Sequence, residues 1–233
     1  MEIQKEFESI GGIFVHPLQE MIEKFKGIKA FVFDWDGVFN NAQKNENKSS
    51  TFNEADSMGT NLIRYDYYFR AGRMPNTAII SGEKNEMAFH FCNREHFDES
   101  YFKVPNKIIA LNHFCEKHQL QASEVCYFFD DVLDLSVAEK VGFRIMINRK
   151  ANPLFRNYVI KNDLADYVTG HDSGNFAVRE ACELLMGITG NFDHIMQERT
   201  KFSANYQEYI NLRQTLPTAF FTVMNAEIIS VVL

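Results

Sequence analysis

The sequence predicts an α/β fold built on a central parallel sheet. Short apolar runs, typical of strands that are covered on both faces, alternate with segments of helical periodicity. The composition, with 45% hydrophobic and 24% charged residues, is that of an ordinary globular protein. A chain of 233 residues is long enough for one principal core and short for two independent ones.

Residues 1–27 are expected to form a lead-in segment whose helix covers an edge of the core. Apolar residues recur at helical spacing after Pro17, namely Leu18, Met21, Ile22 and Phe25. The opening MEIQKEFESIGG is acidic and lacks the order of basic, apolar and small residues of a signal peptide. No span approaches the roughly 18 apolar residues of a membrane helix. A cytoplasmic location without a membrane partner is therefore expected.

The first buried strand is AFVFD at residues 30–34, which ends at Asp34. Its run is short, continuous and apolar, as in strands covered on both faces. The polar residues 38–53 have no helical period and predict a hairpin or flap. Residues 56–71 carry an apolar face at helical spacing, which predicts a helix.

A second strand, TAIIS at residues 77–81, ends at Ser81 and Gly82 before a helix that begins near Glu83. This order of strand, tight turn and helix is the repeating unit of α/β folds. The sequence therefore predicts that Ser81 lies at the same edge of the sheet as the end of the first strand.

Two further units follow. The third has a weak strand at residues 101–104 and a helix opened by Pro105, whose missing N–H has no helical partner in any case. Lys107 falls in the first turn of that helix, and the fourth strand, VCYFFD at 125–130, is apolar until Asp130. Helices and strands then alternate at residues 137–141, 143–147, 153–160, 166–169 and 176–186. Such alternation predicts parallel strands joined by right-handed crossovers.

Residues 188–233 are expected to form a helical and apolar extension to a main domain at 28–187. The extension begins with a helical pattern, and the part after Pro217 ends in the apolar run IISVVL. Its length, Asn225 and Glu227 argue against a membrane anchor. Exposed apolar surface invites association, so this tail is expected to pack on its own chain or on a neighbouring subunit.

Polar side chains that follow the strands are expected to meet at one edge of the sheet, where ligands bind in such folds. They are Asp34, Asp36, Ser81, Asp130, Asp131 and Asp134. Several carboxylates in one place cannot all stay ionised without a compensating cation. Because the set offers only oxygen ligands, without histidine or cysteine, it predicts Mg²⁺.

Two aspartates one residue apart suit phosphoryl transfer. With Mg²⁺ bound, one carboxylate can attack phosphorus and form an aspartyl-phosphate, which divides a hard hydrolysis into two easier steps. The other can protonate the leaving oxygen and then activate water. The hydroxyl of Ser81, the neighbouring backbone N–H groups and a lysine can hold the phosphoryl oxygens.

The charge balance argues against nucleic acid as a partner. The chain has 31 acidic and 24 basic residues, a formal charge of -7, and no dense basic cluster. Its cysteines are widely spaced, form no CxxC pair and are interpreted as reduced core thiols: Cys92, Cys115, Cys126 and Cys182.

These residues resemble the haloacid dehalogenase superfamily of phosphatases, whose four motifs occur here in order. The motifs are Asp34-Trp35-Asp36-Gly37, Ser81-Gly82, Lys107, and Asp130-Asp131 followed by Asp134. The closer similarity, over roughly residues 28–186, is to the capless branch typified by the 3-deoxy-D-manno-octulosonate 8-phosphate phosphatase family. It also rests on FNEADSMG at 52–59 and FFDDVLDLSVAEKVG at 128–142.

The resemblance implies a Rossmann-like (haloacid dehalogenase-like) three-layer sandwich with a small β-hairpin flap and no large cap domain. It implies Mg²⁺ dependence and a homo-oligomer, usually a tetramer, in which the hairpins build contacts and neighbouring subunits help to close the site. In this family's pattern Asp34 is nucleophile and metal ligand, while Asp36 is acid/base and a ligand through its backbone carbonyl. Asp130 is the third protein ligand.

The same resemblance assigns phosphate binding to the second and third motifs, that is, to Ser81, Gly82 and Lys107. Asp134 would support the metal site or Lys107, with Asp131 beside it. Asp131 is also explained as a helix N-cap, which is preferred here over direct ligation of the metal.

Several positions depart from the family pattern. The branch commonly has Gly-Arg after the second strand, and this chain has Gly82-Glu83. An acid where a cation meets an anionic sugar acid phosphate argues against the octulosonate substrate. The Asp-Gly after the first motif is Asn40-Asn41, and the flap is shorter and very polar. The predicted substrate is a small sugar-type phosphomonoester.

Alternatives remain open for single residues and for the function. Ser81 could serve only as a helix N-cap. Lys107 could be a solvated helix residue without a role in the site, and Asn106 or Lys103 could be mistaken for the motif residue. Glu83 motivates a catalytically weakened oligomeric or regulatory protein as the second function. A phosphotransferase or mutase of the same superfamily is disfavoured, because the short gap between the first two motifs leaves little room for a cap domain.

Overall fold

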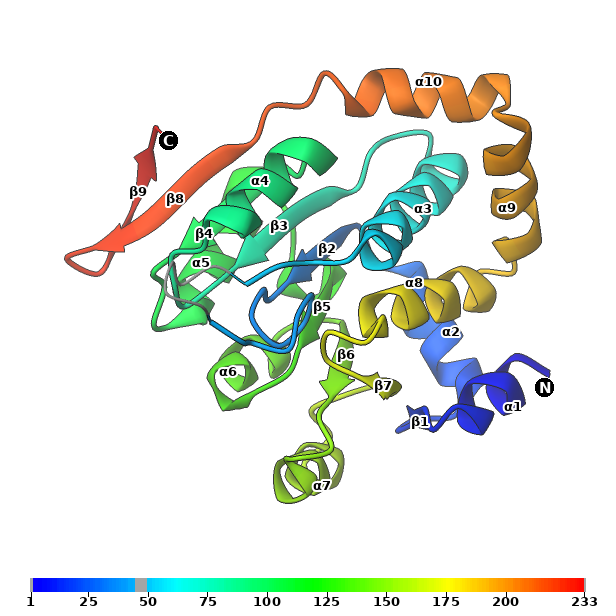
Figure 1. Cartoon of the computed structure of the whole chain (residues 1–233), viewed down its shortest axis with the longest axis horizontal. Coiled ribbons are helices and arrows are strands. Elements are labelled where there is room, and N and C mark those ends of the chain that lie inside the picture. The colour runs from blue at the N-terminus through cyan, green and yellow to red at the C-terminus, as the bar shows by residue number, and fades with distance from the viewer. Residues whose placement is uncertain (1, 45–49, 233) are drawn as a thin grey trace.

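The computed structural model describes residues 2–44 and 50–232. These residues contain a nine-stranded sheet (Figure 1). The strand order is β1-β7-β6-β5-β2-β3-β4-β8-β9. Neighbouring strands are parallel except at the two ends, where β1 pairs with β7 and β8 with β9 in antiparallel fashion. The predicted α/β fold with a central parallel sheet is confirmed.

The inner strands are largely buried, and the two central ones are apolar throughout because both of their faces are covered. The inner strands are β2 (Ala30–Phe33), β3 (Asn76–Ile80), β4 (Glu99–Phe102), β5 (Val125–Phe129), β6 (Phe143–Asn148) and β7 (Tyr167–Asp172). Successive side chains point to opposite faces of a strand. In β2, Phe31 and Phe33 accordingly enter one apolar cluster, whereas Ala30 and Val32 enter the other.

Helices cover both faces and complete three layers (Figure 1). One apolar cluster takes its helical side chains from α2 (Leu18–Lys26), α3 (Glu54–Ala71), α4 (Glu86–Glu95) and α8 (Ala177–Ile188). The other takes them from α5 (Lys107–His118), α6 (Leu135–Ala138) and α7 (Pro153–Lys161), and a short 3₁₀ turn, η1 (Ala122–Glu124), precedes β5. The cysteines are buried and free of disulfides, as predicted.

Two boundaries differ from the sequence prediction. The helix expected near Glu83 begins at Glu86, because the Asn85 side chain caps it by accepting a hydrogen bond from the Met87 N–H at 3.0 Å. The strand expected at residues 101–104 begins two residues earlier. It ends before Lys103, whose φ of +52° leaves the extended region.

The flap predicted at residues 38–53 is only partly described. Its central residues 45–49 lie outside the described residues. The flanking residues 38–44 and 50–53 contain no strand, and the only pairing in this described stretch is an isolated bridge between Asp36 and Asn40. These flanks are therefore loops held by side chains rather than the strands of a hairpin.

Before the first inner strand the chain adds an edge to the sheet. The helix predicted after Pro17 is present as α2, and Leu18, Met21 and Phe25 are buried on it. The structure also contains α1 (Glu2–Ser9) and β1 (Ile13–Phe14), which the sequence pattern did not predict. A strand of two residues carries too little pattern to be recognised without its partner β7.

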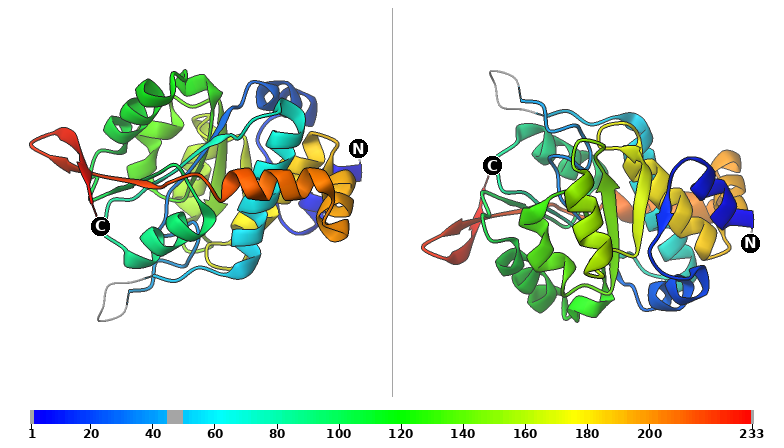
Figure 2. Two further views of the ribbon diagram at one scale, coloured as in Figure 1. Left: turned by 90° about the horizontal axis from the view of Figure 1, so that it is seen from above. Right: turned by 90° about the horizontal axis from the view of Figure 1, so that it is seen from below.

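Beyond α8 the chain returns to the opposite edge of the sheet. Helices α9 (Phe192–Lys201) and α10 (Ala204–Arg213) pass near α3, and β8 (Ala219–Met224) then pairs with β4. The antiparallel partner β9 (Glu227–Val231) is the last strand. Figure 2 shows the β8–β9 hairpin and the N-terminus at opposite ends of the molecule. No helix in the described part is both long and apolar enough to cross a bilayer.

Candidate active site

Parallel pairing of two central strands brings Asp34 and Asp130 together. Phe33 in β2 pairs with Phe128 in β5, and each strand then ends at its aspartate. The Asp34 N–H donates to the Phe128 carbonyl at 2.9 Å, which extends the pairing up to the site. Both aspartates are buried, at 5% and 2% exposure.

Asp134 joins this pair from the 3₁₀ turn η2 (Val132–Asp134) that follows β5. Carboxylate oxygens of Asp34, Asp130 and Asp134 all lie within 4.8 Å of one another. Asp131 caps this turn by accepting a hydrogen bond from the Val132 N–H at 2.7 Å, so its predicted capping role is confirmed. Tyr127 adds a hydroxyl that donates to Asp134 Oδ1 at 2.5 Å.

Lys107 is the lysine that reaches this group. It is the first residue of α5, and its Nζ lies 2.6 Å from Asp34 Oδ1 and 2.6 Å from Asp134 Oδ1. Its side chain is only 4% exposed. Lys103 is exposed and Asn106 takes the N-cap position, so neither of these neighbours takes its place.

Burial and mutual repulsion alter the protonation of these groups. Burial raises the pKa of Asp34 to about 7; Lys107 opposes the rise and Asp134 adds to it. Burial, followed by the charges of Asp34 and Asp134, raises the pKa of Asp130 to about 8. The pKa of Lys107 is raised because its two carboxylate partners outweigh the opposing effect of burial.

The charge balance at this point favours a cation ligand. Against the three carboxylates stand Lys107 and the Arg149 guanidinium, whose NH2 contacts Asp130 Oδ2. One negative charge is left over when all three carboxylates are ionised. The surplus and the purely oxygen donor set fit Mg²⁺.

The Asp36 carboxylate lies beside this group rather than within it. Its Oδ1 accepts a hydrogen bond from the Ser50 hydroxyl at 2.5 Å, and its Oδ2 lies 3.2 Å from Lys44 Nζ. Asp36 still lines the same cavity as Asp34. Its carboxyl is thus held apart from the close group of acids.

Glycine at position 37 is required by its surroundings. Its φ is +92°, and an added Cβ would lie 2.0 Å from Asp130 Oδ2. Asn40 then closes the turn, because its Nδ2 donates to the Trp35 carbonyl at 3.2 Å and its Oδ1 accepts from the Ala42 N–H at 2.9 Å. The departure from the family pattern at Asn40 therefore leaves a side chain that holds the loop.

A cavity of about 190 Å³ collects all of the predicted site residues. They are Asp34, Asp36, Ser81, Gly82, Lys107, Asp130, Asp131 and Asp134. Ser81 follows β3, and its Oγ accepts a hydrogen bond from the Glu83 N–H at 3.3 Å. Glu83 also lines the cavity, so the acid that replaces the family's arginine lies at the site.

Sequence reasoning missed four residues of this site: Lys44, Ser50, Tyr127 and Arg149. Arg149 follows β6 at the same edge of the sheet, so the rule that found Asp34 and Asp130 could have found it. Lys44 and Ser50 belong to a polar stretch without periodicity, which offers no comparable signal.

Comparisons with known proteins agree with this geometry. No family model matches the chain. It is 30% identical to the 3-deoxy-D-manno-octulosonate 8-phosphate phosphatase KdsC of Escherichia coli K12 over 178 residues, 75% of this chain and 87% of the relative. KdsC of Salmonella typhi is 30% identical over 179 residues, covering 74% and 87%.

A solved structure gives the same result. The 3-deoxy-D-manno-octulosonate 8-phosphate phosphatase of Moraxella catarrhalis, in complex with a magnesium ion, a phosphate ion and a KDO molecule, superposes with a TM-score of 0.65. The identity is 26%, and the match covers 80% of this chain and 100% of that one. This chain therefore belongs to the 3-deoxy-D-manno-octulosonate 8-phosphate phosphatase family of the haloacid dehalogenase superfamily, and it is a phosphatase that hydrolyses phosphomonoesters.

Proposed function

We propose that this phosphatase hydrolyses a small sugar-type phosphate in a Mg²⁺-dependent reaction with Asp34 as the nucleophile. The observation that carries the proposal is the convergence of three buried carboxylates in one cavity, where two of them contact Lys107. Enzymatic phosphoryl transfer depends mostly on positioning and charge stabilisation, which such a site supplies. The magnesium and phosphate ions in the Moraxella catarrhalis relative support the proposal.

Asp34, Asp130 and the backbone carbonyl of Asp36 would hold the metal, with Asp134 in support. When bound, Mg²⁺ supplies charge neutralisation at the phosphoryl oxygens. The raised pKa values of Asp34 and Asp130 support this assignment, because burial and, after it, the charge of neighbouring carboxylates disfavour their ionised forms, which a bound cation would stabilise.

Asp34 would form a bond from its carboxylate oxygen to phosphorus while the bond from phosphorus to the leaving oxygen breaks. Asp36 would give its proton to that oxygen, which leaves as an alcohol. Asp36 would then take a proton from the water that attacks the aspartyl-phosphate and releases phosphate. The Asp36 side chain lines the same cavity as Asp34 while it contacts Ser50 and Lys44, outside the close group of acids.

Phosphate binding falls to Ser81, Gly82 and Lys107. The Ser81 hydroxyl and the backbone N–H groups beside it would donate to phosphoryl oxygens, and the Lys107 ammonium would offset their charge. Lys107 already contacts Asp34 at 2.6 Å, so the nucleophile and the phosphate-binding cation are held together before substrate arrives.

The substrate proposal departs from the sugar acid for which the relatives are named. Glu83 is exposed and lines the cavity, where it would oppose a second anionic group on the substrate. A neutral sugar phosphate avoids this opposition. The proposal also includes a homotetramer, as the family resemblance implies, and light scattering on the purified protein would test it. The cytoplasmic location stays a prediction from the sequence.

Phosphate release from a panel of sugar phosphates, with Mg²⁺ or with EDTA, tests the function. Neutral sugar phosphates are expected to be hydrolysed faster than 3-deoxy-D-manno-octulosonate 8-phosphate, only with metal, and not by Asp34→Asn. The Asp163→Asn variant is the matched control, because it makes the same change at an exposed position that does not line the cavity. Absence of turnover on every member of the panel, despite Mg²⁺ binding, would favour the catalytically weakened protein instead.

A further inference from the structure

A second cavity, of about 250 Å³, lies between α3, α4, α9 and α10. It shares no lining residue with the catalytic cavity. Its volume is several times the share of one water molecule, about 30 Å³. Three arginines line it, Arg94, Arg199 and Arg213, against two glutamates, Glu54 and Glu95.

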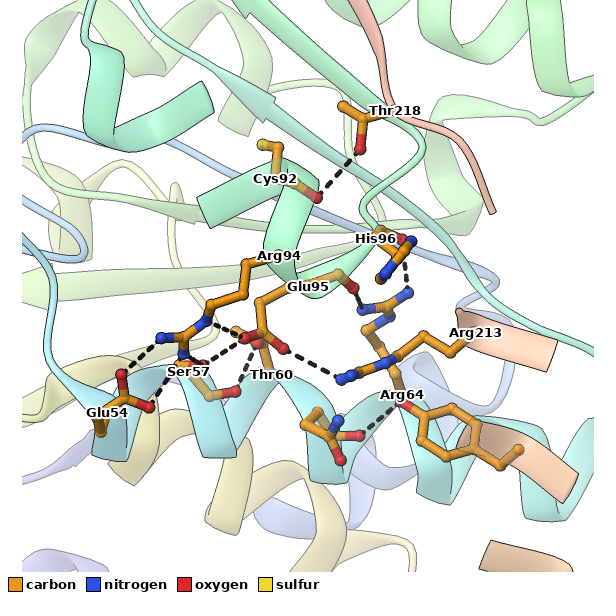
Figure 3. Close-up of polar contacts among 12 residues, drawn as sticks. Glu54, Ser57, Thr60, Arg64, Cys92, Arg94, Glu95, His96, Arg213 and Thr218 are labelled. Atoms are coloured by element: carbon orange, nitrogen blue, oxygen red, sulfur yellow. Dashed lines mark hydrogen bonds and ion pairs between the residues drawn. The ribbon is translucent and has the colours of Figure 1, made fainter. Parts of the chain in front are cut away.

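Glu95 is the centre of an ordered polar network beside this cavity (Figure 3). Its Oε1 accepts hydrogen bonds from the Ser57 hydroxyl and from Arg94 Nε, both at 2.8 Å. Its Oε2 accepts from Arg213 NH1 at 3.1 Å. Arg94 also donates to both carboxylate oxygens of Glu54, at 2.6 and 3.0 Å. Glu54 and Glu95 are therefore matched by Arg94 and Arg213.

Arg199 is the third arginine of the cavity, beside the two that pair with the glutamates. Within the described residues no carboxylate forms an ion pair with it, and its buried Nε has no hydrogen-bond partner. The buried Nε of Arg213 likewise lacks a partner there, although the Arg213 side chain is only 10% exposed. Arg199 therefore brings to the cavity a positive charge that no carboxylate of the described residues pairs with.

The rest of the lining is suited to the body of a small molecule. Phe202, Tyr206 and Ile210 contribute apolar surface, and Asn61 contributes an amide. The Arg199 guanidinium lies over the Tyr206 ring at 5.1 Å from its centroid, which holds it at the cavity wall. Apolar walls with a few convergent polar groups are the usual make-up of ligand sites.

We propose that this cavity binds a small organic oxyanion. Its carboxylate or phosphate group accepts hydrogen bonds from Arg199 and Arg213, and its body packs against Tyr206 and Ile210. The planar fork of arginine matches both kinds of oxyanion. Both arginines come from α9 and α10, and α3 and α4 supply the remaining polar lining of the site.

Isothermal titration calorimetry in EDTA tests this proposal separately from catalysis, because the catalytic aspartates repel anions when metal is absent. The probes are glucose 6-phosphate and glucuronate, which distinguish phosphate from carboxylate, with glucose as the neutral reference. One or both anions are expected to bind saturably at one site, and glucose is not. Arg199→Gln is expected to weaken that binding by about tenfold or more.

Lys201→Gln is the matched control, since it removes the same charge from an exposed position on the same helix. It is expected to change the affinity by less than about twofold. If circular dichroism shows that Arg199→Gln is unfolded, Arg199→Lys keeps the charge without the fork and is expected to bind more weakly than wild type. Equal affinity of wild type and a folded Arg199 variant overturns the proposal. So does the absence of binding by both anions up to about 10 mM.

Discussion

Two buried clusters of charge in this molecule are balanced in different ways. In the catalytic cavity three carboxylates converge, and burial raises the pKa of Asp34 and Asp130. Beside the second cavity the buried Glu95 accepts hydrogen bonds from Arg94 and Arg213, and the hydrogen bond from Arg94 lowers the pKa of the exposed Glu54. The buried glutamate is thus balanced by neighbouring side chains, whereas the catalytic carboxylates keep a surplus negative charge, which the proposed cation would neutralise.

Removing the cation from the catalytic cluster should have the largest effect. Lys107→Met deletes the charge that contacts both Asp34 and Asp134, and kcat/KM is expected to fall by about 10³-fold, equivalent to about 4 kcal/mol. Steady-state assays of phosphate release measure it. Lys103→Met, the same change at an exposed neighbour, is expected to leave kcat/KM within about twofold. Similar losses in the two variants would contradict a specific role for Lys107.

Breaking the balanced cluster should cost stability rather than activity. Glu95→Ala leaves Arg213 buried without its carboxylate, and the free energy of unfolding is expected to fall by about 3 kcal/mol. Urea denaturation followed by circular dichroism measures the loss. Glu86→Ala, at an exposed position on the same helix, is expected to change stability little. A Glu95→Ala protein as stable as Glu86→Ala would show that the network contributes little.

Binding of Mg²⁺ to the catalytic carboxylates should stabilise the folded protein. At a Mg²⁺ concentration 100 times the dissociation constant, binding to the folded state alone is expected to add about 2.7 kcal/mol. Thermal melts with Mg²⁺ and with EDTA report this as a higher Tm. Asp130→Asn should reduce the shift, whereas Asp163→Asn at an exposed loop position should keep it. An unchanged shift in Asp130→Asn would remove Asp130 from the ligands.

In the metal-free protein, protonation of the catalytic carboxylates at lower pH should stabilise the folded state. Because the folded pKa values of Asp34 and Asp130 are about 7 and 8, the folded state binds more protons than the unfolded state above about pH 4. Their contribution therefore makes stability fall as pH rises from about 4 to 8, by up to about 1.4 kcal/mol per pH unit for each proton.

Urea titrations in EDTA at pH 6, 7 and 8, in wild type and Asp130→Asn, isolate this contribution. The variant lacks one titrating carboxyl and removes repulsion from the other, so its stability should depend less on pH in this window. An identical pH dependence in the two proteins would show that Asp130 does not titrate as proposed.

The central strands could be predicted from the sequence because both of their faces are buried. Residues 30–33 and 125–129 are apolar without interruption, and each run leads directly to an aspartate. Because alternating strands and helices predict a parallel sheet, the convergence of Asp34 and Asp130 follows from strand direction alone. The amino-acid pattern is therefore sufficient to place these motif residues at one edge of the sheet.

The edge strands could not be predicted in the same way. The residues of β8 were recognisable as apolar, but their strand conformation depends on pairing with β4. Lys44 and Ser50 reach Asp36 from a loop whose course has no periodic signal. The division into 28–187 and an extension at 188–233 stays a prediction, although β8 lies in the same sheet as the motif strands.

The pairing of β8 with β4 has a consequence for how the chain reaches its native state. Thr222 donates its hydroxyl hydrogen bond to the carbonyl of Phe102, a residue 120 positions earlier. At synthesis rates of about 5–20 residues per second, β4 would wait on the order of ten seconds for this neighbour. During that time a strand rich in aromatic side chains carries an open edge, which is the kind of surface that recruits chaperones or other nascent chains.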